Sequence, residues 1–294
     1  MMFWHIYVTD NRILQQPDVR QQAVDLLSAC PILRFCRDRG KIVEEPPGMA
    51  DDQLAYWVPL RLLLSKPGTA DRCPSIHWQG ASMPLPSAII PESMLAESEK
   101  PLRVEVQRFG RPVLPDFPSL FISISHSGNF TVLSVSDVLN GIDVQEIRPV
   151  RPYVAERFFT AADRNMLLSS ATDVSRSSLF FRLWTIREAY TKFTGRGLSE
   201  GFNTFDVRWM EHMIVPHPSR DRKDPPRLSA YFTELAPPSP GCCMSAVTLL
   251  PGMKPELFYF LPMDETVRRS GVMNDLQEPC FRQSFIPVSV SPHL

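Results

Sequence analysis

The sequence predicts an α+β fold of two halves that meet near residue 140, and three observations support this. The predicted elements run strand, helices, strands, and then strand, helices, strands again. The dipeptide Asn140-Gly141 is a turn signal between the two runs. Apolar side chains at helical spacing over 177–194, followed by Gly195 and Gly197, predict an amphipathic helix with a defined end. No sequence identity links the halves, so a repeat is a hypothesis about topology alone.

The first half is expected to begin with a strand over 3–8, where aromatic and β-branched residues are frequent. Leucines at helical spacing predict helices over 18–36 and 52–65. The Pro- and Ser-rich segment 66–101 is expected to be mainly loop. Three strands are then predicted, over 102–108, 119–125 and 130–136.

The second half is expected to open with a strand at Ile142, followed by a helical stretch over 151–171 and the amphipathic helix. Strands are predicted after it over 203–209, 228–234, 244–250 and 257–261. Four prolines and mixed charge in 216–227 are typical of a surface insertion. The predicted division is an N-terminal half over 1–139, a C-terminal half over 140–262 and a loosely held tail over 263–294.

Composition narrows the class of protein. With 44% hydrophobic and 21% charged residues, the chain resembles a soluble globular protein that can bury a core. A net charge of −1 gives no bulk attraction to nucleic acid or to an anionic membrane, so an anion site must be built from a few placed residues. No stretch approaches the ~20 apolar residues of a membrane span. We therefore expect neither nucleic acid nor membrane as a partner.

The N-terminus and the cysteines indicate the compartment. The N-terminal region around residues 3–8 lacks the basic segment and the long apolar core of a signal peptide. It also lacks the Arg-rich character of a transit peptide, so a cytoplasmic location is expected. The six cysteines form no CxxC pair, and no histidine pair has metal-ligand spacing. This argues against zinc and favours a reduced, intracellular protein.

The first segment with chemical potential is Phe121-Ile122-Ser123-Ile124-Ser125-His126-Ser127-Gly128. Hydroxyls, turn N–H groups and an imidazole are donors suited to a phosphate. On the pattern alone, a serine-rich β-turn with a surface histidine is the simpler interpretation.

The second segment is Gly141-Ile142-Asp143-Val144-Gln145. Strand alternation puts Asp143 and Gln145 on one face. A carboxylate on a short apolar strand is costly to bury unless it is paired or binds a cation. The alternative is an edge-strand carboxylate in water, and the pattern does not choose between the two.

The third segment runs from Trp184 to Lys192 and contains Glu188. Glu188 and Lys192 are four residues apart, so they share one face of a helix. A solvated ion pair worth ~0.3–0.5 kcal/mol is the simpler interpretation. Trp184 lies one turn earlier on the same face, however, so this face is not simply polar.

In this order and spacing, the segments resemble the phosphopantetheinyl transferases of the surfactin-synthetase-activating type. The matching elements are Gly110-Arg111-Pro112, Ser125-His126-Ser127, Gly141 to Gln145, Arg157-Phe158-Phe159, Trp184 to Lys192 and Gly195-Arg196-Gly197-Leu198. The resemblance is good over 110–208, loose in the N-terminal third and nearly absent over 212–294.

The resemblance implies a pseudo-dimer of two similar α+β halves, each a small antiparallel sheet packed with helices. The active site, with coenzyme A as substrate, would lie in the cleft between them. Mg²⁺ is the implied cofactor, and its implied ligands are Asp143, Glu188 and Gln145. Mg²⁺ prefers oxygen ligands and usually keeps waters and substrate phosphates, so two carboxylates and a pyrophosphate would suffice.

The resemblance also implies a set of coenzyme A contacts: Arg61, Arg111, Pro112, Ser125, His126, Arg187 and Lys192. His126 and Lys192 match phosphate contacts, and Arg111 and Pro112 match the wall of the nucleotide pocket. Arg61 matches an arginine that reaches the 3′-phosphate.

Two positions depart from the family pattern. Gln145 stands where Glu is more common, and its amide oxygen can ligate Mg²⁺ or hold a metal-bound water without adding charge. Arg187 stands where Lys is usual, and a guanidinium can still grip a phosphate bidentately. Asp163 matches an acidic position after the Phe-Phe motif.

The implied reaction is that of a holo-[acyl-carrier-protein] synthase, a transferase that moves 4′-phosphopantetheine from coenzyme A to a serine of an apo carrier protein and releases 3′,5′-ADP. The implied catalytic residues are Glu188, Lys192 and Asp143. Lys192 and Mg²⁺ would neutralise the pyrophosphate, and Glu188 or a water it orients would accept the serine proton. The implied partners are acyl or peptidyl carrier domains of fatty acid, polyketide or nonribosomal peptide synthases. A monomer is expected, because a chain of two halves can form its own cleft.

Three alternatives stay open at this point. A degenerate family member would bind coenzyme A or a carrier protein without transfer. An Mg²⁺-dependent phosphohydrolase would act on another substrate. In a scaffold protein, the simpler interpretation would hold for all three segments. Coenzyme A would then not stabilise the protein against unfolding, whereas a tightly bound ligand stabilises by a few kcal/mol.

Overall fold

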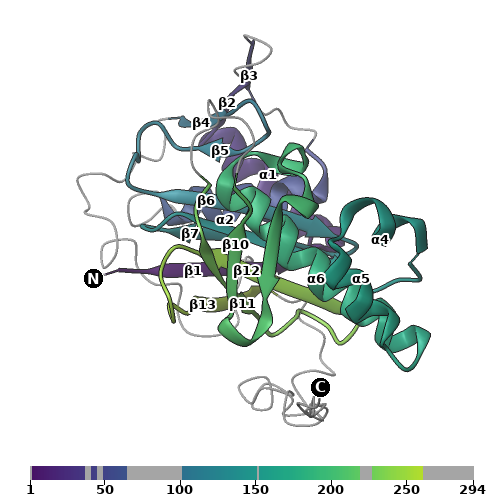
Figure 1. Cartoon of the computed structure of the whole chain (residues 1–294). Helices are drawn as coiled ribbons and strands as arrows, with labels where there is room; N and C mark the ends of the chain where they lie inside the picture. The colour runs from purple at the N-terminus through teal and green to yellow at the C-terminus, as the bar shows by residue number, and fades with distance from the viewer. Residues whose placement is uncertain are drawn as a thin grey trace, which may run out of the picture. The chain divides into compact units, whose positions relative to one another are not determined.

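The computed structural model describes residues 2–36, 41–44, 49–64, 101–150, 152–218 and 227–260 (Figure 1). The chain divides into two units, Met1–Pro262 and Met263–Leu294. The second unit, which is the predicted tail, lies outside the described residues, and so do residues 66–100 of the predicted loop. The first unit combines helices with small sheets and has the predicted α+β class.

The first sheet has the strand order β13-β1-β7-β6. Its strands are β1 (Trp4–Asp10), β6 (Phe121–Ser127), β7 (Phe130–Ser136) and β13 (Glu256–Phe260). The pairs β1–β7 and β6–β7 are antiparallel, whereas β13 runs parallel to β1. The strand predicted near 257–261 therefore exists, but it completes the sheet that the N-terminal residues begin.

The second sheet has the order β8-β12-β11-β10-β9 and is antiparallel throughout. Its strands are β8 (Asn140–Glu146), β9 (Phe205–Arg208), β10 (Met213–Pro216), β11 (Ala230–Glu234) and β12 (Cys242–Thr248). A third, smaller sheet has the order β3-β2-β4-β5. Its strands are β2 (Ile32–Cys36), β3 (Lys41–Glu44), β4 (Leu102–Val106) and β5 (Pro112–Val113).

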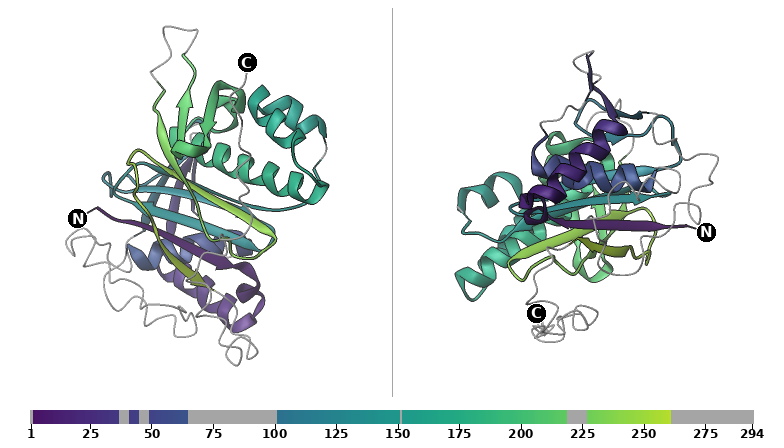
Figure 2. Two further views of the ribbon diagram at one scale, coloured as in Figure 1. Left: turned by 60° about the horizontal axis from the view of Figure 1, so that its bottom comes forward. Right: turned by 180° about the vertical axis from the view of Figure 1, so that it is seen from behind.

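Helices α1 (Pro17–Ala29) and α2 (Asp51–Leu63) pack on each other, and α2 also packs on β7 (Figure 2). The helix predicted over 18–36 is wrong after Ala29. Pro31 lacks a backbone N–H and disfavours helical geometry at the residue before it, and Cys30 has φ −132° and ψ 69°. The chain then enters β2, which pairs in parallel with β4.

The helical stretch predicted over 151–171 is two helices, α4 (Pro152–Phe158) and α5 (Ala161–Leu168). The Thr160 side chain accepts a hydrogen bond from the N–H of Asp163, and the Asp163 carboxylate accepts one from the N–H of Thr160. This capping box starts a new helix at the point where the pattern alone looks continuous.

The long helix α6 (Asp173–Thr194) begins after Thr172, whose hydroxyl accepts from the N–H of Ser175, and ends at Gly195 with φ 71°. Its buried face packs on β8 and β12 (Figure 2). Short 3₁₀ turns follow it or lie elsewhere in the chain: η1 (Asn11–Gln15), η5 (Gly197–Glu200), η6 (Phe202–Thr204) and η7 (Trp209–Glu211).

Gly141 allows α6 to lie directly on β8. A Cβ atom at this position would overlap the main-chain carbonyl oxygen of Ala189 and would lie 2.6 Å from the backbone nitrogen of Phe193. Since these are main-chain atoms, they cannot move aside without a shift of the helix. Only glycine therefore permits this separation between the strand and the helix that carry the candidate site residues.

Serine hydroxyls join the edge strands of the two larger sheets. The Oγ atoms of Ser123, Ser125 and Ser127 on β6 accept hydrogen bonds from the backbone N–H groups of Ile142, Val144 and Glu146 on β8, at 3.1, 3.4 and 3.0 Å. These three serines are called the serine stripe below. Strand alternation puts them on one face of β6, so the sequence Ser-Ile-Ser-His-Ser places one acceptor opposite every second amide of β8. The stripe thereby fixes the register between the two strands and satisfies an otherwise open sheet edge.

Candidate active site

A pocket of about 350 Å³ lies between the β5–β6 region and the C-terminal part of α6. It is lined by Phe109, Gly110, Arg111, Pro112, Ile122, Ser123, Ile124, Glu188, Thr191, Lys192, Gly195, Gly197 and Leu198. Segments almost eighty residues apart in sequence thus meet here. The pocket contains four of the predicted site residues, namely Arg111, Pro112, Glu188 and Lys192.

Arg111 is held against the end of α6. Its Cδ atom would lie 2.9 Å from a Cβ at Gly195, so this glycine leaves room for the arginine side chain. The guanidinium also lies 6.0 Å from the ring centre of Phe121. The guanidinium is partly buried, and this loss of solvent lowers the pKa of Arg111 from its usual value. Such a cation interacts more strongly with an anion than one in open solvent does.

Asp143 is the centre of a hydrogen-bond network beside this pocket. Its Oδ1 atom accepts from Ser125 Oγ at 2.6 Å and from Lys192 Nζ at 2.7 Å, and its Oδ2 accepts from Gln145 Nε2 at 3.3 Å. The residue is 1% exposed. The carboxylate predicted from strand alternation is therefore buried and paired, and the alternative of an edge carboxylate in water is wrong.

Glu188 lies on the same side of α6 as Lys192, and burial raises its pKa to about 7. The negative charge of Asp143 also raises this pKa, while Lys192 lowers it. The carboxylate of Glu188 therefore interacts electrostatically with both the carboxylate of Asp143 and the ammonium group of Lys192. Glu188 and Lys192 therefore do not form the simple solvated ion pair considered from the sequence. They belong to a partly buried cluster with Asp143.

Comparison with known proteins agrees with this arrangement. Residues 140–228 match the sequence model of the 4′-phosphopantetheinyl transferase superfamily. This part of the chain is therefore similar to that superfamily. The predicted family resemblance is thereby confirmed.

Three curated relatives are 4′-phosphopantetheinyl transferases from bacilli. The chain is 40% identical over 107 residues to psf-1 of Bacillus pumilus, and this alignment covers 36% of this chain and 46% of the relative. It is 30% identical over 139 residues to ffp of Bacillus subtilis, covering 46% and 62% of the two chains. It is 30% identical over 130 residues to Sfp of Bacillus subtilis strain 168, covering 44% and 58%. The matches thus span about half of these relatives' lengths.

The donor set of this site fits a divalent cation. Asp143 and Glu188 supply carboxylate oxygens, and the effect of Asp143 on the pKa of Glu188 shows that they share one electrostatic environment. Across the described ranges, no three His, Cys, Asp or Glu side chains gather as a metal site, so the candidate site rests on these two carboxylates. Gln145 turns its Nε2 toward Asp143, while its Oε1 accepts from Ser127 Oγ at 3.3 Å.

The Ser-His-Ser motif of the family divides into two roles here. Ser125 is buried and bonded to Asp143, so it holds the carboxylate. His126, one residue on, points the other way, with a side chain that is 61% exposed and an Nε2 atom 4.0 Å from Asp52 Oδ2. Neither residue lines the 350 Å³ pocket. His126 is accessible to a ligand, as its predicted phosphate contact requires.

Arg61 and Arg187 lie elsewhere than their predicted roles suggest. Arg61 is 0% exposed within α2, and burial lowers its pKa while nearby Cys30 opposes the shift. Arg187 is also 0% exposed: its guanidinium pairs with Asp163 and donates to the carbonyl oxygens of Phe202 and Phe205. Neither guanidinium reaches the pocket in this structure.

Two contributions to the site were not predicted from the sequence. Ser123 lines the pocket, whereas the family resemblance implies contacts for Ser125 and His126 of the same segment. Asp163 is the buried partner of Arg187, so it ties α5 to the residue directly before Glu188. The alternation of the serines signals the first contribution. No local pattern signals the second, because the pair joins residues 24 positions apart.

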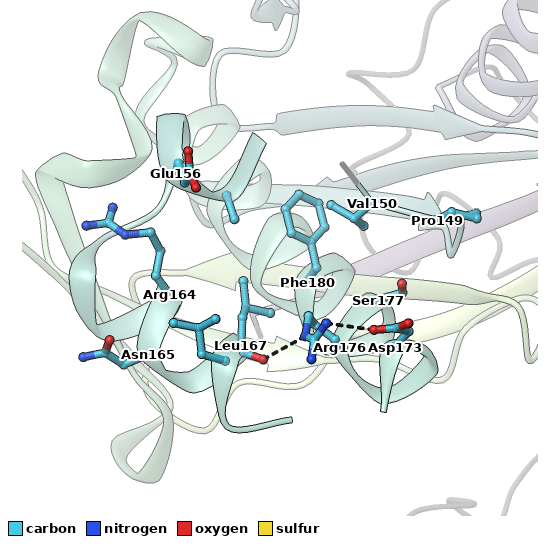
Figure 3. Close-up of a pocket in the computed structure, with 12 residues that line it drawn as sticks. Pro149, Val150, Glu156, Arg164, Asn165, Leu167, Asp173, Arg176, Ser177 and Phe180 are labelled. Carbon is cyan, nitrogen blue, oxygen red and sulfur yellow. Dashed lines mark hydrogen bonds and ion pairs between the residues drawn. The ribbon is translucent and has the colours of Figure 1, made fainter. Parts of the chain in front are cut away.

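A second, larger pocket of about 680 Å³ lies among α4, α5 and the first half of α6 (Figure 3). Its floor contains Val150, Leu167 and Phe180, and none of the predicted site residues lines it. The Arg176 guanidinium at its edge is bonded to Asp173 and to the carbonyl oxygen of Leu167, as Figure 3 shows. The family motifs therefore converge on the smaller pocket. Within the described part of the chain, no helix is long and apolar enough to cross a membrane.

Proposed function

We propose that this protein transfers the 4′-phosphopantetheine group of coenzyme A to a serine of an apo carrier protein, giving holo-carrier protein and 3′,5′-ADP. One observation supports this above all. The pocket joins Arg111 and Pro112 to Glu188 and Lys192, and each pair belongs to a separate motif of a superfamily whose model matches residues 140–228. A phosphohydrolase or a scaffold gives no reason for these motifs to meet.

The proposed architecture is a pseudo-dimer of two similar α+β halves with the site between them. The first sheet, with β6 at its edge, and the second, with β8 at its edge, are the candidate halves. Arg111 and Pro112 come from the N-terminal side and would bind the nucleotide. Glu188 and Lys192 come from the C-terminal side and would handle the pyrophosphate.

Each charged side chain has a task that its position suits. Lys192, which is 27% exposed at its side chain, can hold a pyrophosphate oxygen while it remains near Asp143. The exposed His126 would contact another phosphate oxygen. A carboxylate oxygen of Glu188 accepts the proton of the carrier serine, directly or through a water.

Mg²⁺ is the proposed cofactor, with Asp143 and Glu188 as its protein ligands. When bound, it would neutralise negative charge on the pyrophosphate of coenzyme A. Ser125 and Gln145 support this role by orienting Asp143 through hydrogen bonds to its two oxygens. Gln145 thus serves as a donor to the ligand carboxylate, in the orientation that the structure gives it.

The proposed partners are acyl or peptidyl carrier domains of fatty acid, polyketide or nonribosomal peptide synthases. A cytoplasmic location and a monomeric state belong to the same proposal. The three bacillar relatives carry the name of transferases, which gives no support to the alternative of a degenerate member that binds without transfer.

Intact-mass spectrometry tests the proposal. Several apo carrier domains are incubated with the full chain, coenzyme A and Mg²⁺, and a mass gain of one phosphopantetheine is expected. EDTA and Glu188→Ala should each abolish the gain. Glu211→Ala is the matched control, because Glu211 is an exposed glutamate paired with Arg208 outside the pocket. No gain on any carrier domain, with coenzyme A bound, would show that the protein binds without transfer.

A further inference from the structure

The hydroxyls of the serine stripe follow a simple bonding rule. Ser125 accepts from the N–H of Val144 and donates to the side chain of Asp143, the residue before it. Ser127 likewise accepts from the N–H of Glu146 and donates to the side chain of Gln145. Each hydroxyl thus uses its oxygen for a β8 amide and its proton for the preceding β8 side chain.

Ser123 is the exception to this rule. Its Oγ accepts from the N–H of Ile142 at 3.1 Å, but the preceding residue is Gly141, which has no side chain to accept the proton. Among the residues that the structure describes, no hydrogen bond donated by this hydroxyl is found, and its recorded bond is the one it accepts from Ile142. Ser123 is 4% exposed and lines the 350 Å³ pocket, which Ser125 and Ser127 do not.

A buried hydroxyl that accepts but does not donate carries an unmet donor. Gly141 cannot be replaced by a residue with an acceptor, because α6 occupies the space where its side chain would lie. The same glycine that lets α6 approach β8 therefore leaves the proton of Ser123 free. In the pocket, Arg111 and Lys192 provide positive charge, and Phe109 and Leu198 provide apolar walls. This combination suits a phosphorylated nucleoside.

We propose that Ser123 donates a hydrogen bond from its hydroxyl to an acceptor on the nucleotide part of coenzyme A bound in this pocket. This inference rests on the proposed function, because it takes coenzyme A as the ligand. It makes Ser123 a binding residue, distinct from Ser125, whose proton is used to hold Asp143, and from Ser127, whose proton goes to Gln145.

Titration calorimetry with coenzyme A and with 3′,5′-ADP tests the inference on the full chain. Ser123→Ala removes both the amide acceptor and the free donor. Ser127→Ala removes a matched amide acceptor from the same stripe but lies outside the pocket. Ser123→Thr keeps a hydroxyl. We expect Ser123→Ala to weaken both ligands about 3- to 10-fold, the usual range for one neutral hydrogen bond, while Ser127→Ala and Ser123→Thr bind like the natural protein.

The outcomes separate this inference from the function on which it rests. If the natural protein binds coenzyme A and Ser123→Ala binds both ligands with unchanged affinity, the role of Ser123 is refuted. An equal loss in Ser123→Ala and Ser127→Ala, with equal falls in melting temperature, also refutes it, because the loss then comes from the shared amide contact. If the natural protein binds neither ligand, the proposed function itself fails, and this inference fails with it.

Discussion

Lys192 Nζ lies 2.7 Å from Asp143 Oδ1, so a single ion pair joins the last turns of α6 to strand β8. The carboxylate is almost fully buried, with a side chain that is 2% exposed, whereas the ammonium remains partly accessible. Asp143 therefore depends on Lys192 for charge compensation, while Lys192 can still face a ligand. The pair therefore contributes both to the stability of the site and to its charge.

Replacing Asp143 with Asn should separate these two effects. The amide keeps the size of the side chain and can still accept from Ser125, so the melting temperature should change by only a few degrees. Carrier modification should fall at least ~100-fold, the scale seen when one charge-stabilising group is removed from an active site. Asp116→Asn is the control, because Asp116 pairs with Arg103 outside the pocket. Modification at the natural rate by Asp143→Asn would show that Asp143 is not needed for the reaction.

The raised pKa of Glu188 predicts a pH dependence of stability in metal-free protein. The folded-state pKa of about 7 exceeds the ordinary value of 4.5. Well below pH 4.5 the carboxyl is protonated in both the folded and the unfolded state, so it does not affect the free energy of unfolding. As pH rises from 4.5 through 7, the unfolded state loses its proton first, so this group lowers the free energy of unfolding by on the order of 3 kcal/mol.

Glu188→Gln removes this titration and is the measurement that checks it. Urea unfolding in EDTA is followed between pH 5 and pH 8 for both proteins. The natural protein should lose stability relative to Glu188→Gln as pH rises, and the difference should level off above pH 8. A constant difference across this range would contradict the assignment of a near-neutral pKa to Glu188.

Gly141→Ala should destabilise the protein and impair the site together. The added Cβ would overlap the carbonyl oxygen of Ala189, so α6 must move away from β8. Overpacking of this kind costs about 1–3 kcal/mol. The shift would also separate Lys192 from Asp143, so we expect weaker transfer as well as a lower midpoint of urea unfolding.

Gly241→Ala is the matched control for this prediction. Gly241 is exposed, and a Cβ there would lie 3.7 Å from Ser239 Oγ, an ordinary contact distance. This variant should therefore unfold within about 0.5 kcal/mol of the natural protein. If the two alanine variants prove equally stable and active, the close contact between Gly141 and α6 is not what sets the position of the helix.

The elements predicted best from the sequence are those defined by local signals. The long helix predicted over 177–194 is α6, and Gly195 ends it with the left-handed geometry expected of a helix-stop glycine. The strand predicted over 130–136 matches β7 in both bounds. In these cases spacing and turn chemistry determine the structure within a few residues of each position.

Elements that depend on distant partners were missed or misassigned. Strand β2 was predicted as helix, because its pairing with β4 involves residues about seventy positions away. Strand β13 was predicted as a strand, but its parallel pairing with β1 could not be inferred. At the site, the four-residue spacing of Glu188 and Lys192 correctly predicted that they share one face of a helix. Spacing could not predict that the side chain of Arg187 pairs with Asp163 in the interior.

The pair of Arg187 and Asp163 supports a prediction about stability. Asp163→Asn would leave the buried guanidinium with the carbonyl oxygens of Phe202 and Phe205 but without a compensating charge. Breaking a buried pair by removing one partner costs about 3–5 kcal/mol. We expect a loss of this size in the free energy of urea unfolding. Glu211→Ala, which breaks the exposed pair with Arg208, should cost about 0.5 kcal/mol or less.

A double-mutant cycle distinguishes the charge effect from the loss of a capping residue, since Asp163 also accepts from the N–H of Thr160. Arg187→Met alone and Asp163→Asn alone each leave one buried charge uncompensated, whereas the double variant leaves none. The double variant should therefore be more stable than the sum of the two losses predicts, by about 2 kcal/mol. Strict additivity would mean that the two side chains stabilise α5 and α6 independently, and the ion pair would then not be what anchors the helix next to Glu188.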